Sequence, residues 1–313
     1  TRQVSSAASD VYKRQNLGYA VIDEQHRFGV KQRSKIWEKN NPPPHVLIMT
    51  ATPIPRTLTM SLYGDLDLSI IDELPPGRKD VITVHRKDKN RLKVFGFIRD
   101  QIKQGRQIYI VYPLIEESKK MDLKYLEDGL ESITREFDKE NYSIGVMHGR
   151  MRSSNKDIEM NNFLNGKIDI LISTTVIEVG VNVPNASVMI IENAERFGLS
   201  QLHQLRGRVG RGKYDSYCVL MTNDKISEDA KIRIDAMVNS NDGFKISEVD
   251  LRLRGPGDVL GTKQSGVLDF KIADIIEDES ILFSVSNEAD LLIKKDPKLN
   301  LNENLFFKSS SSL

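Results

Sequence analysis

Residues 168–173 read IDILIS, and residues 187–192 read SVMIIE. Each is a short apolar run that carries a polar side chain at its end. Short apolar runs of this kind are typical of strands buried on both faces, and such strands occur in parallel sheets whose faces are covered by helices. The two runs therefore predict a parallel α/β sheet.

Strands and helices alternate around these two runs. Further strands are predicted at 107–112, 143–147 and 216–221, and helices at 121–137, 155–165 and 200–209. We expect six such units to form a complete doubly wound domain over 77–224. Earlier apolar runs at 17–23 and 46–49, with a short helix at 31–39 between them, show the same βαβ pattern and predict part of another α/β domain over 16–76.

Prolines, glycines and charged stretches divide the rest of the chain. Pro75, Pro76 and Gly77 mark a break, and the polar stretch to about Asn90 is expected to bridge two domains. After Asp224, we expect a charged helix at 228–239, then a glycine-rich loop, and a second helical region at 272–293. The segment over 225–269 is expected to form a helical hairpin and loop, and 270–313 to form C-terminal helices and a tail. The small, polar residues 1–15 show no periodicity and are expected to be non-native or disordered.

The composition excludes several classes of protein. The 45 basic and 44 acidic side chains nearly balance, so any contact with DNA must come from local patches. No apolar stretch offers the roughly 20 uncharged residues of a membrane span, so no membrane contact is expected. The single cysteine, Cys218, cannot form an internal disulfide and favours a reducing compartment, with the cytoplasm as the expected location.

Side chains suited to phosphate chemistry follow the two early strands. They are Asp23, Glu24, His26, Thr50, Ala51 and Thr52. A strand-terminal aspartate can hold Mg²⁺ through water while the adjacent glutamate polarises the water that attacks a terminal phosphate. Hydroxyls on the adjacent strand can hydrogen-bond these carboxylates and report the nucleotide state. Taken singly, the first group is more often a solvated turn and the second a proline turn, but their positions at the ends of adjacent strands weaken both alternatives.

An arginine- and glycine-rich block lies at 204–212 and reads QLRGRVGRG. Its candidate catalytic residues are Gln204, Arg208 and Arg211, and the two arginines are also candidate nucleotide ligands. A guanidinium from a second domain can neutralise the charge that develops on a γ-phosphate. The alternatives are a basic surface helix without a ligand and a contact with DNA phosphates in place of ATP. The preceding motifs favour the contact with ATP.

Two further groups of candidate ligands follow other strands: His148, Gly149, Arg150, Thr174, Gly180 and Asn182. Hydroxyls and a glycine turn at a strand end suit one nucleic-acid phosphate, and Asn182 is placed to reach a ribose or a partner motif. The group that begins at His148 can hold a neighbouring phosphate. By itself, a histidine at this position is more often structural.

In this order, the blocks over about 17–217 resemble the conserved blocks of superfamily 2 helicases. Residues 242–266, which read DGFKISEVDLRLRGPGDVLGTKQSG, resemble the translocation motif shared by the RecG family and the transcription-repair coupling factor. The wording LRGPGD and GTKQSG within it, with YGDLD at 63–67 and LPPGR at 74–78, is similar to the RecG family. A loop tethered by glycines and carrying Arg252, Arg254 and Gln264 could swing against duplex DNA as motor domains close.

The resemblance implies a partial first RecA-like domain and a complete second one, each with a parallel sheet, followed by the hairpin, its loop and C-terminal helices. It also implies ATP and Mg²⁺ as cofactors, with Asp23 holding the metal through water. The intact protein is expected to be an ATP-dependent double-stranded DNA translocase and helicase that drives branch migration and fork reversal in recombination and repair. Expected partners are forks and Holliday junctions, with a single-stranded DNA-binding protein as a candidate, and a monomer is expected.

The sequence holds no Gly-x-x-x-x-Gly-Lys-Ser/Thr phosphate loop, so the chain is expected to be a fragment that is inactive alone. Three alternatives remain. The wording of the translocation motif argues against the coupling factor, and the segment after Asp224 argues against an RNA helicase. A catalytically dead adaptor should have lost charged positions, yet Asp23, Glu24, Arg208 and Arg211 are present.

Overall fold

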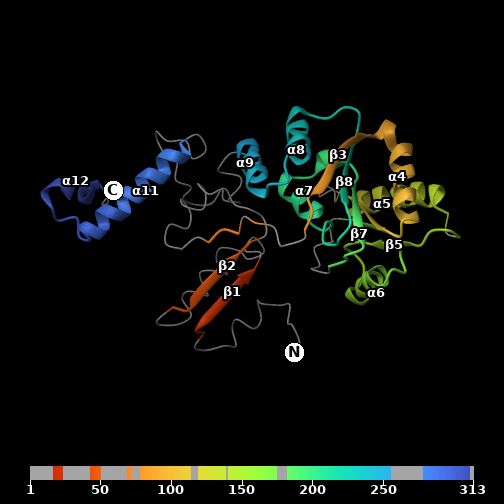
Figure 1. Ribbon diagram of the computed structural model, residues 1–313, viewed down its shortest axis with the longest axis horizontal. Coiled ribbons are helices and arrows are strands. Elements are labelled where there is room, and N and C mark those ends of the chain that lie inside the picture. The colour runs from red at the N-terminus through yellow and green to blue at the C-terminus, as the bar shows by residue number, and fades with distance from the viewer. Residues whose placement is uncertain are drawn as a thin grey trace.

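The computed structural model describes residues 17–23, 43–50, 69–71, 73, 78–113, 119–138, 140–174, 182–254 and 278–310. Within them the strands form two parallel sheets, one with two strands and one with six (Figure 1). The parallel α/β class predicted from the sequence is therefore confirmed.

The small sheet joins β1 (Tyr19–Asp23) to β2 (His45–Met49) in parallel. Tyr19 lies opposite His45, and Asp23 lies opposite Met49. Both strands were predicted, whereas the helix expected at 31–39 lies outside the described residues. Because the two strands end together, Asp23 and Thr50 are brought to the same edge of this sheet.

The large sheet has the strand order β3-β8-β7-β4-β6-β5, and each neighbouring pair is parallel. The bounds are β3 Val81–Lys87, β4 Gln107–Tyr112, β5 Ile144–Met147, β6 Ile170–Thr174, β7 Ala186–Ile191 and β8 Ser216–Thr222. Every residue of β4, β6 and β7 is buried, as their continuous apolar runs predicted.

Strand β3 corrects one expectation. A polar bridge between domains was predicted up to about Asn90, but Val81–Lys87 is an edge strand that pairs only with β8 among the described strands. Its Val81 and Thr83 are buried, whereas the intervening Ile82 is 49% exposed. An edge strand with one solvated face tolerates alternating polar residues, so it lacks the continuous apolar run by which the inner strands were recognised.

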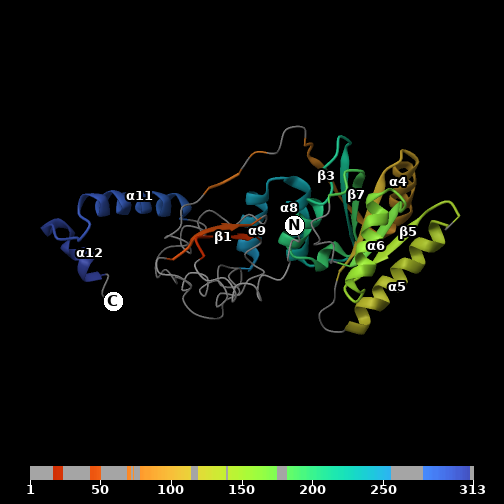
Figure 2. The same cartoon turned by 90° about the horizontal axis from the view of Figure 1, so that it is seen from below.

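Helices cover both faces of the large sheet (Figures 1 and 2). They are α4 Arg91–Lys103, α5 Lys119–Glu136, α6 Ser153–Leu164, α7 Leu199–Arg206, α8 Glu228–Asn239 and α9 Gly243–Arg254, with short 3-10 turns η2 Asp88–Asn90 and η3 Ala194–Arg196. Successive side chains of a strand point to opposite faces. Ile108 and Ile110 of β4 therefore join the core under α4 and α5, while Tyr109 and Val111 join the core under α6 to α9.

A helical hairpin was expected over 225–269, but with a glycine-rich loop directly after the helix at 228–239; residues Gly243–Arg254 form helix α9 there instead. Its Ile246 and Leu251 are buried, and it packs against α7 and α8. Arg252 and Arg254 consequently lie in the last turn of a helix, although they were predicted to lie in a loop.

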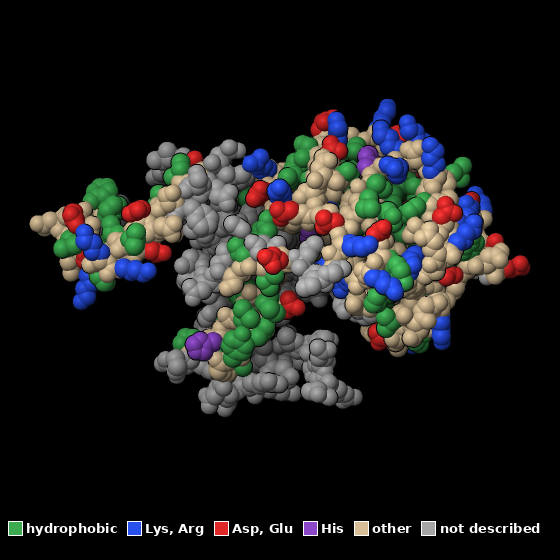
Figure 3. Space-filling model, viewed as in Figure 1, with side chains coloured by type: hydrophobic (Ala, Val, Ile, Leu, Met, Phe, Trp, Pro, Cys, Tyr) green, Lys and Arg blue, Asp and Glu red, His purple; other side chains and the backbone are tan. Residues whose placement is uncertain are grey.

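The C-terminal segment contains α11 (Glu279–Lys295), η4 (Asn302–Asn304) and α12 (Leu305–Ser310). The carboxylate of Asp296 ends α11 by accepting hydrogen bonds from the backbone N–H groups of Asn300 and Leu301 at 3.0 and 2.8 Å. Apolar side chains are exposed along this segment, as Figure 3 shows for the end of the molecule that holds α11 and α12. Among the described residues, no helix combines the length and apolar character needed to cross a membrane.

Candidate nucleotide and nucleic-acid sites

The arginine block predicted at 204–212 begins on a firmly anchored helix. Leu199, Leu202 and Leu205 of α7 are buried in the core, the first two completely. The side chain of Gln201 accepts a hydrogen bond of 3.2 Å from the backbone N–H of Gly198, which satisfies a donor at the start of the helix. The residues that follow α7 are therefore held by a rigid support.

Arg206, the first arginine of the block, is structural. The residue is only 3% exposed, and its guanidinium donates hydrogen bonds to the carbonyl oxygens of Met237 at 2.9 Å and Ser240 at 2.7 Å. These carbonyls lie at the C-terminal end of α8, where the last carbonyl groups of a helix lack partners within it. Arg206 thus joins the arginine block to the helix that follows the large sheet.

Arg208 and Arg211 lie on the same face of the sheet as Tyr109. Burial lowers the pKa of Arg211, and the neighbouring positive charges of Arg208 and Arg78 lower it further. Burial raises the pKa of Tyr109 to about 12, while the charges of Arg208 and Arg211 oppose that rise. Arg211 also donates from Nε to the carbonyl oxygen of Gly207 at 3.0 Å. The structure therefore gathers several guanidiniums in a partly desolvated place, which favours the binding of an anion.

Two glycines of the block are required by its close packing. Gly210 has φ +77°, and a Cβ atom at Gly212 would lie 2.3 Å from the carbonyl oxygen of Pro184. Asn182 is exposed two residues before Pro184. The block and the segment that carries Asn182 therefore run side by side, as their joint assignment to a nucleotide site requires.

All of these groups belong to the amino edge of the large sheet. Arg208 and Arg211 precede the start of β8, and Asn182 precedes the start of β7. Because the strands are parallel, their amino ends share one edge. Gln204 is half-buried one turn earlier on α7.

A second set of candidates lies at the opposite, carboxyl edge. His148 follows β5 directly, and Ser173 and Thr174 end β6, the neighbouring strand. The buried atoms His148 Nδ1, Ser173 Oγ and Thr174 Oγ1 have no hydrogen-bond partner within the described part of the chain. Buried polar atoms in folded proteins are usually paired, and an unpaired one costs free energy. Such a group of atoms is typical of a surface that meets a ligand.

The loop after β5 adds positive charge to this edge. Gly149 and Arg150 are exposed there, and Lys156 of α6 donates from Nζ to the carbonyl oxygen of Gly149 at 3.1 Å. The backbone N–H of His148 donates to the sulfur of Met151 at 3.4 Å, which fixes the turn. The loop therefore places cations beside the strand-end hydroxyls, an arrangement suited to phosphate groups.

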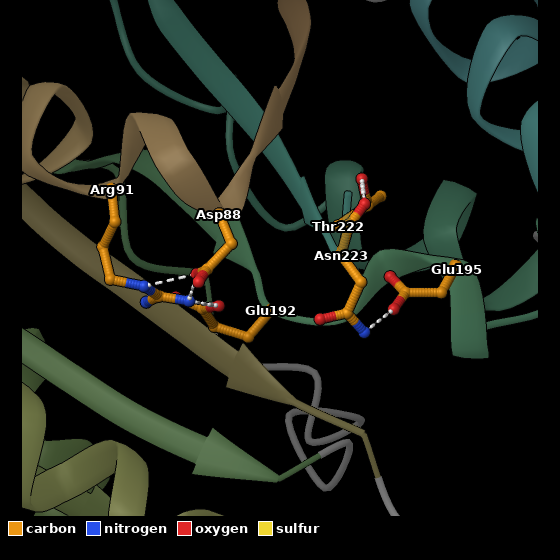
Figure 4. A network of polar contacts seen from close by, with 6 residues as sticks. All are labelled: Asp88, Arg91, Glu192, Glu195, Thr222 and Asn223. Atoms are coloured by element: carbon orange, nitrogen blue, oxygen red, sulfur yellow. Dashed lines mark hydrogen bonds and ion pairs between the residues drawn. The ribbon is translucent and has the colours of Figure 1, made fainter. Parts of the chain in front are cut away.

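Sequence reasoning missed a polar network at the carboxyl ends of β3, β7 and β8 (Figure 4). Arg91 makes a two-pronged ion pair with Glu192, with Nη1–Oε1 and Nη2–Oε2 distances of 2.7 and 2.9 Å, and its Nε donates to Asp88 at 2.7 Å. Asn223 donates to Glu195 at 2.7 Å in the same region. Burial alone would lower the pKa of Arg91, but the hydrogen bonds and charge of Glu192 raise it overall.

The part of this network formed by Arg91, Glu192 and Asp88 is structural, because the guanidinium is paired with both carboxylates. Glu192 has a side chain only 5% exposed, so the pair fixes the start of α4 to the end of β7. The sequence holds one signal for it: Arg91 follows Asp88 by three residues at the start of the apolar pattern Val94, Phe95 and Ile98.

The remaining predicted residues have different outcomes. Asp23 is exposed at the end of β1 beside Thr50, as predicted, and Arg252 is exposed on α9. Glu24, His26, Ala51, Thr52, Gly180 and Gln264 lie outside the described residues, and so does the side chain of Arg254. Within the described residues no group of three or more His, Cys, Asp or Glu side chains is gathered to bind a metal ion. Cys218 is buried, and burial raises the pKa of its thiol to about 12, as expected for a structural cysteine.

Comparison with known families gives two matches. The "Helicase conserved C-terminal domain" family matches residues 90–213, and the family "ATP-dependent DNA helicase RecG, domain 3, C-terminal" matches residues 240–310. The two matched regions include the arginine block and the α9 segment.

Comparisons with individual proteins point to the same family. The chain is 53% identical to the ATP-dependent DNA helicase RecG of Synechocystis sp. over 94% of its own length and 35% of that protein. It is 49% identical to the RecG of Bacillus subtilis over 90% of its own length and 41% of that protein. A solved structure of RecG bound to a three-way DNA junction is 45% identical, with a TM-score of 0.65, over 86% of this chain and 34% of that one. The chain thus spans well under half the length of these relatives.

Proposed function

The chain belongs to the RecG-type ATP-dependent DNA helicases, whose C-terminal region it matches, and we propose that it provides the second motor domain and DNA-translocating element of such an enzyme. Its larger sheet is the RecA-like helicase C-terminal domain. The observation that carries the proposal is the separation of two polar sites on one sheet. Guanidiniums gather at the amino edge, and hydroxyl and imidazole atoms without a hydrogen-bond partner among the described residues lie at the carboxyl edge.

We assign ATP to the amino edge. Arg208 and Arg211 follow directly after the anchored helix α7, and their positive charges repel each other. A bound triphosphate would relieve this repulsion. Two guanidiniums directed at a terminal phosphate stabilise the charge that grows on it during hydrolysis, and water-excluded surroundings strengthen that effect. Asn182 lies on the adjacent segment and is the candidate contact for the ribose.

Asp23 and Thr50 are the candidates for the other side of the same nucleotide. An exposed carboxylate at a strand end suits Mg²⁺ held through water, and the metal, when bound, would neutralise phosphate charge. Thr50, at the end of the neighbouring strand, is placed to report the state of that carboxylate. Glu24, the proposed activator of water, and His26 remain predictions from the sequence.

We assign DNA to the carboxyl edge. Thr174 and His148 bring buried polar atoms to neighbouring strand ends, where no described residue pairs with them, and Arg150 adds a cation. Contacts of this kind bind the phosphate backbone without reading the base sequence. They suit an enzyme that moves along duplex DNA and acts on forks and Holliday junctions by branch migration and fork reversal in recombination and repair.

The two sites would be coupled through α8 and α9. Arg206 joins the arginine block to the end of α8, and Ser200 of α7 donates to Asp250 of α9 at 3.3 Å. Arg252 and Arg254 at the end of α9, with Gln264 beyond it, are proposed DNA contacts. Closure of the motor around ATP would then displace α9 and the residues that follow it.

The test is DNA-stimulated ATP hydrolysis by the full-length helicase. Replacing Arg211 with alanine should reduce kcat by at least about 100-fold, as expected for loss of a transition-state cation. Binding to a synthetic three-way junction should stay within about twofold, because the DNA site lies at the opposite edge. Unchanged hydrolysis in the Arg211→Ala protein would refute the assignment of ATP to the amino edge.

A second series tests the DNA assignment. Thr174→Val removes a buried hydroxyl that has no partner in the described part of the chain, and Arg150→Ala removes a nearby cation. Both should weaken junction binding, and the arginine variant should also reduce the dependence of binding on salt. Ser187→Ala is a matched control, because Ser187 also carries a buried, unpaired hydroxyl but lies near the amino end of β7.

A further inference from the structure

A short segment runs beside the arginine block without having been assigned to it. Residues Arg78 to Asp80 precede β3 at the amino edge of the large sheet. A Cβ atom at Gly210 would lie 2.8 Å from Cγ2 of Val81 and 3.6 Å from the carbonyl oxygen of Lys79. Lys79 Nζ also makes an ion pair of 2.7 Å with Oδ1 of Asp215, just after the block. The segment is therefore tied to residues on both sides of Arg211.

Arg78 adds another positive charge to the same place. Its side chain is exposed, and no hydrogen bond or ion pair of its guanidinium occurs among the described residues. Burial and Arg208 lower the pKa of Arg211, and Arg78 lowers it further. The pKa of His203 falls to about 4 through burial, with added repulsion from Arg206 and Arg78. The charge of Arg78 therefore acts on Arg211 and on His203 of α7, which agrees with the position of its segment beside Gly210.

Gathering like charges is unfavourable unless an anion compensates them. Asp80 of the same segment partly compensates this positive charge. Its carboxylate opposes the lowering of the pKa of Arg206 by burial. Among the described residues, the influence that opposes the lowering of the pKa of Arg211 comes from the phenol of Tyr109 and not from a carboxylate. The anion that best fits three guanidiniums with forked geometry is a phosphate group with several free oxygens.

We propose that Arg78 is a third arginine of the nucleotide site, binding the terminal phosphate of ATP together with Arg208 and Arg211. This assignment rests on the proposed function, because it takes the amino edge as the nucleotide side. It excludes DNA as the ligand of Arg78, since the proposed DNA contacts lie at the carboxyl edge. Because residues 78–80 lead into β3, ATP would also hold the start of the edge strand against α7.

The experiment compares Arg78→Ala and Arg78→Lys in the full-length helicase, with ATP and ADP as the probes. Arg78→Ala should raise KM for ATP about tenfold, the effect of losing one charge-assisted phosphate contact. Arg78→Lys keeps the charge but loses the fork, so it should recover part of this loss. Affinity for ADP and for a three-way junction should remain within about twofold.

Arg135→Ala is the matched control. Arg135 is an exposed arginine of α5 on the other face of the sheet, paired with Glu131 at 3.0 Å, so its removal should not change KM. A KM for ATP within about twofold of the unchanged protein in Arg78→Ala would overturn the proposal. So would weaker junction binding with unchanged KM, which would make Arg78 a DNA ligand.

Arg211→Ala, measured in parallel, separates this inference from the proposed function. If Arg211→Ala abolishes hydrolysis while Arg78→Ala leaves KM for ATP unchanged, only the assignment of Arg78 fails. If neither variant affects ATP, the nucleotide assignment itself fails. Thermal unfolding of each variant shows whether it is folded. If the alanine variant is unstable, the KM for ATP of Arg78→Lys tests the assignment of Arg78.

Discussion

The guanidinium of Arg206 donates a hydrogen bond of 2.7 Å to the carbonyl oxygen of Ser240, so the last residue of α7 is joined to the residue that follows α8. A second bond, of 2.9 Å, reaches the carbonyl oxygen of Met237. Because Arg206 is buried, these carbonyls have little access to water that could replace it. The first arginine of the block therefore holds structure together, in contrast to the roles proposed for Arg208 and Arg211.

Replacing Arg206 with methionine should lower the free energy of unfolding by about 3 kcal/mol, because the aliphatic volume is kept while buried carbonyl groups lose their donor. Urea unfolding of the chain followed by circular dichroism measures this change. Arg208→Met is the control and should change stability by less than about 0.5 kcal/mol. Equal stability of the two variants would contradict the structural role of Arg206.

Gly212 should tolerate no side chain. A Cβ atom there would approach the carbonyl oxygen of Pro184 to 2.3 Å, so the backbones at the arginine block would have to separate. Gly212→Ala is expected to cost about 2 kcal/mol, as overpacking does in a well-packed protein. Gly96→Ala is the control, because Gly96 lies within α4 and nothing outside the adjoining backbone of that helix approaches the added Cβ within 4 Å. That change should stabilise the chain by about 0.5 kcal/mol, since alanine is the better helix former.

The half-buried imidazole of His203 should make stability depend on pH. Its pKa falls to about 4 in the folded chain, through burial first and then the charges of Arg206 and Arg78. In the unfolded chain the pKa returns to its ordinary value near 6.5, so unfolding takes up a proton between these two pH values. Stability from this group is complete above about pH 6.5 and is lost as pH falls toward 4, by about 3 kcal/mol in total.

Urea unfolding at pH 7 and pH 4.5 tests this sign. His203→Gln should reduce the loss of stability between the two pH values relative to the unchanged chain. His45→Gln, which removes an exposed imidazole, is the matched control substitution. A pH dependence that is identical in all three proteins would show that the protonation of His203 is not linked to folding.

The inner strands of the large sheet were predictable because each is buried on both faces and so is apolar throughout. Strand β3 was missed because it lies at the edge, where polar Thr83, His85 and Arg86 alternate with or follow apolar residues. A helical hairpin was expected over 225–269, but the position of α9 within it was not, because its charged residues lie among only a few buried ones, such as Ile246 and Leu251, which α7 and α8 cover. Tertiary packing, rather than local pattern, decides both segments.

The candidate site shows the same division. Motif order placed Asp23 and Thr50 at one edge, and the paired strands confirm that placement. The roles of Arg206 and Arg78 could not be predicted in this way. The first depends on carbonyl oxygens about thirty residues later in the chain, and the second depends on a segment brought beside the block by the pairing of β3 with β8. Both are relationships between distant parts of the sequence.

In the proposed function, Asp23 and Arg211 act on one ATP molecule. A double-mutant cycle on DNA-stimulated kcat of the full-length helicase, using Asp23→Asn, Arg211→Ala and the combined variant, tests it most directly. Groups that serve one transition state lose their effects together, so the combined variant should be no more than about threefold slower than the slower single variant. Two large effects that multiply fully would mean that the carboxylate and the guanidinium act independently, and would contradict the account.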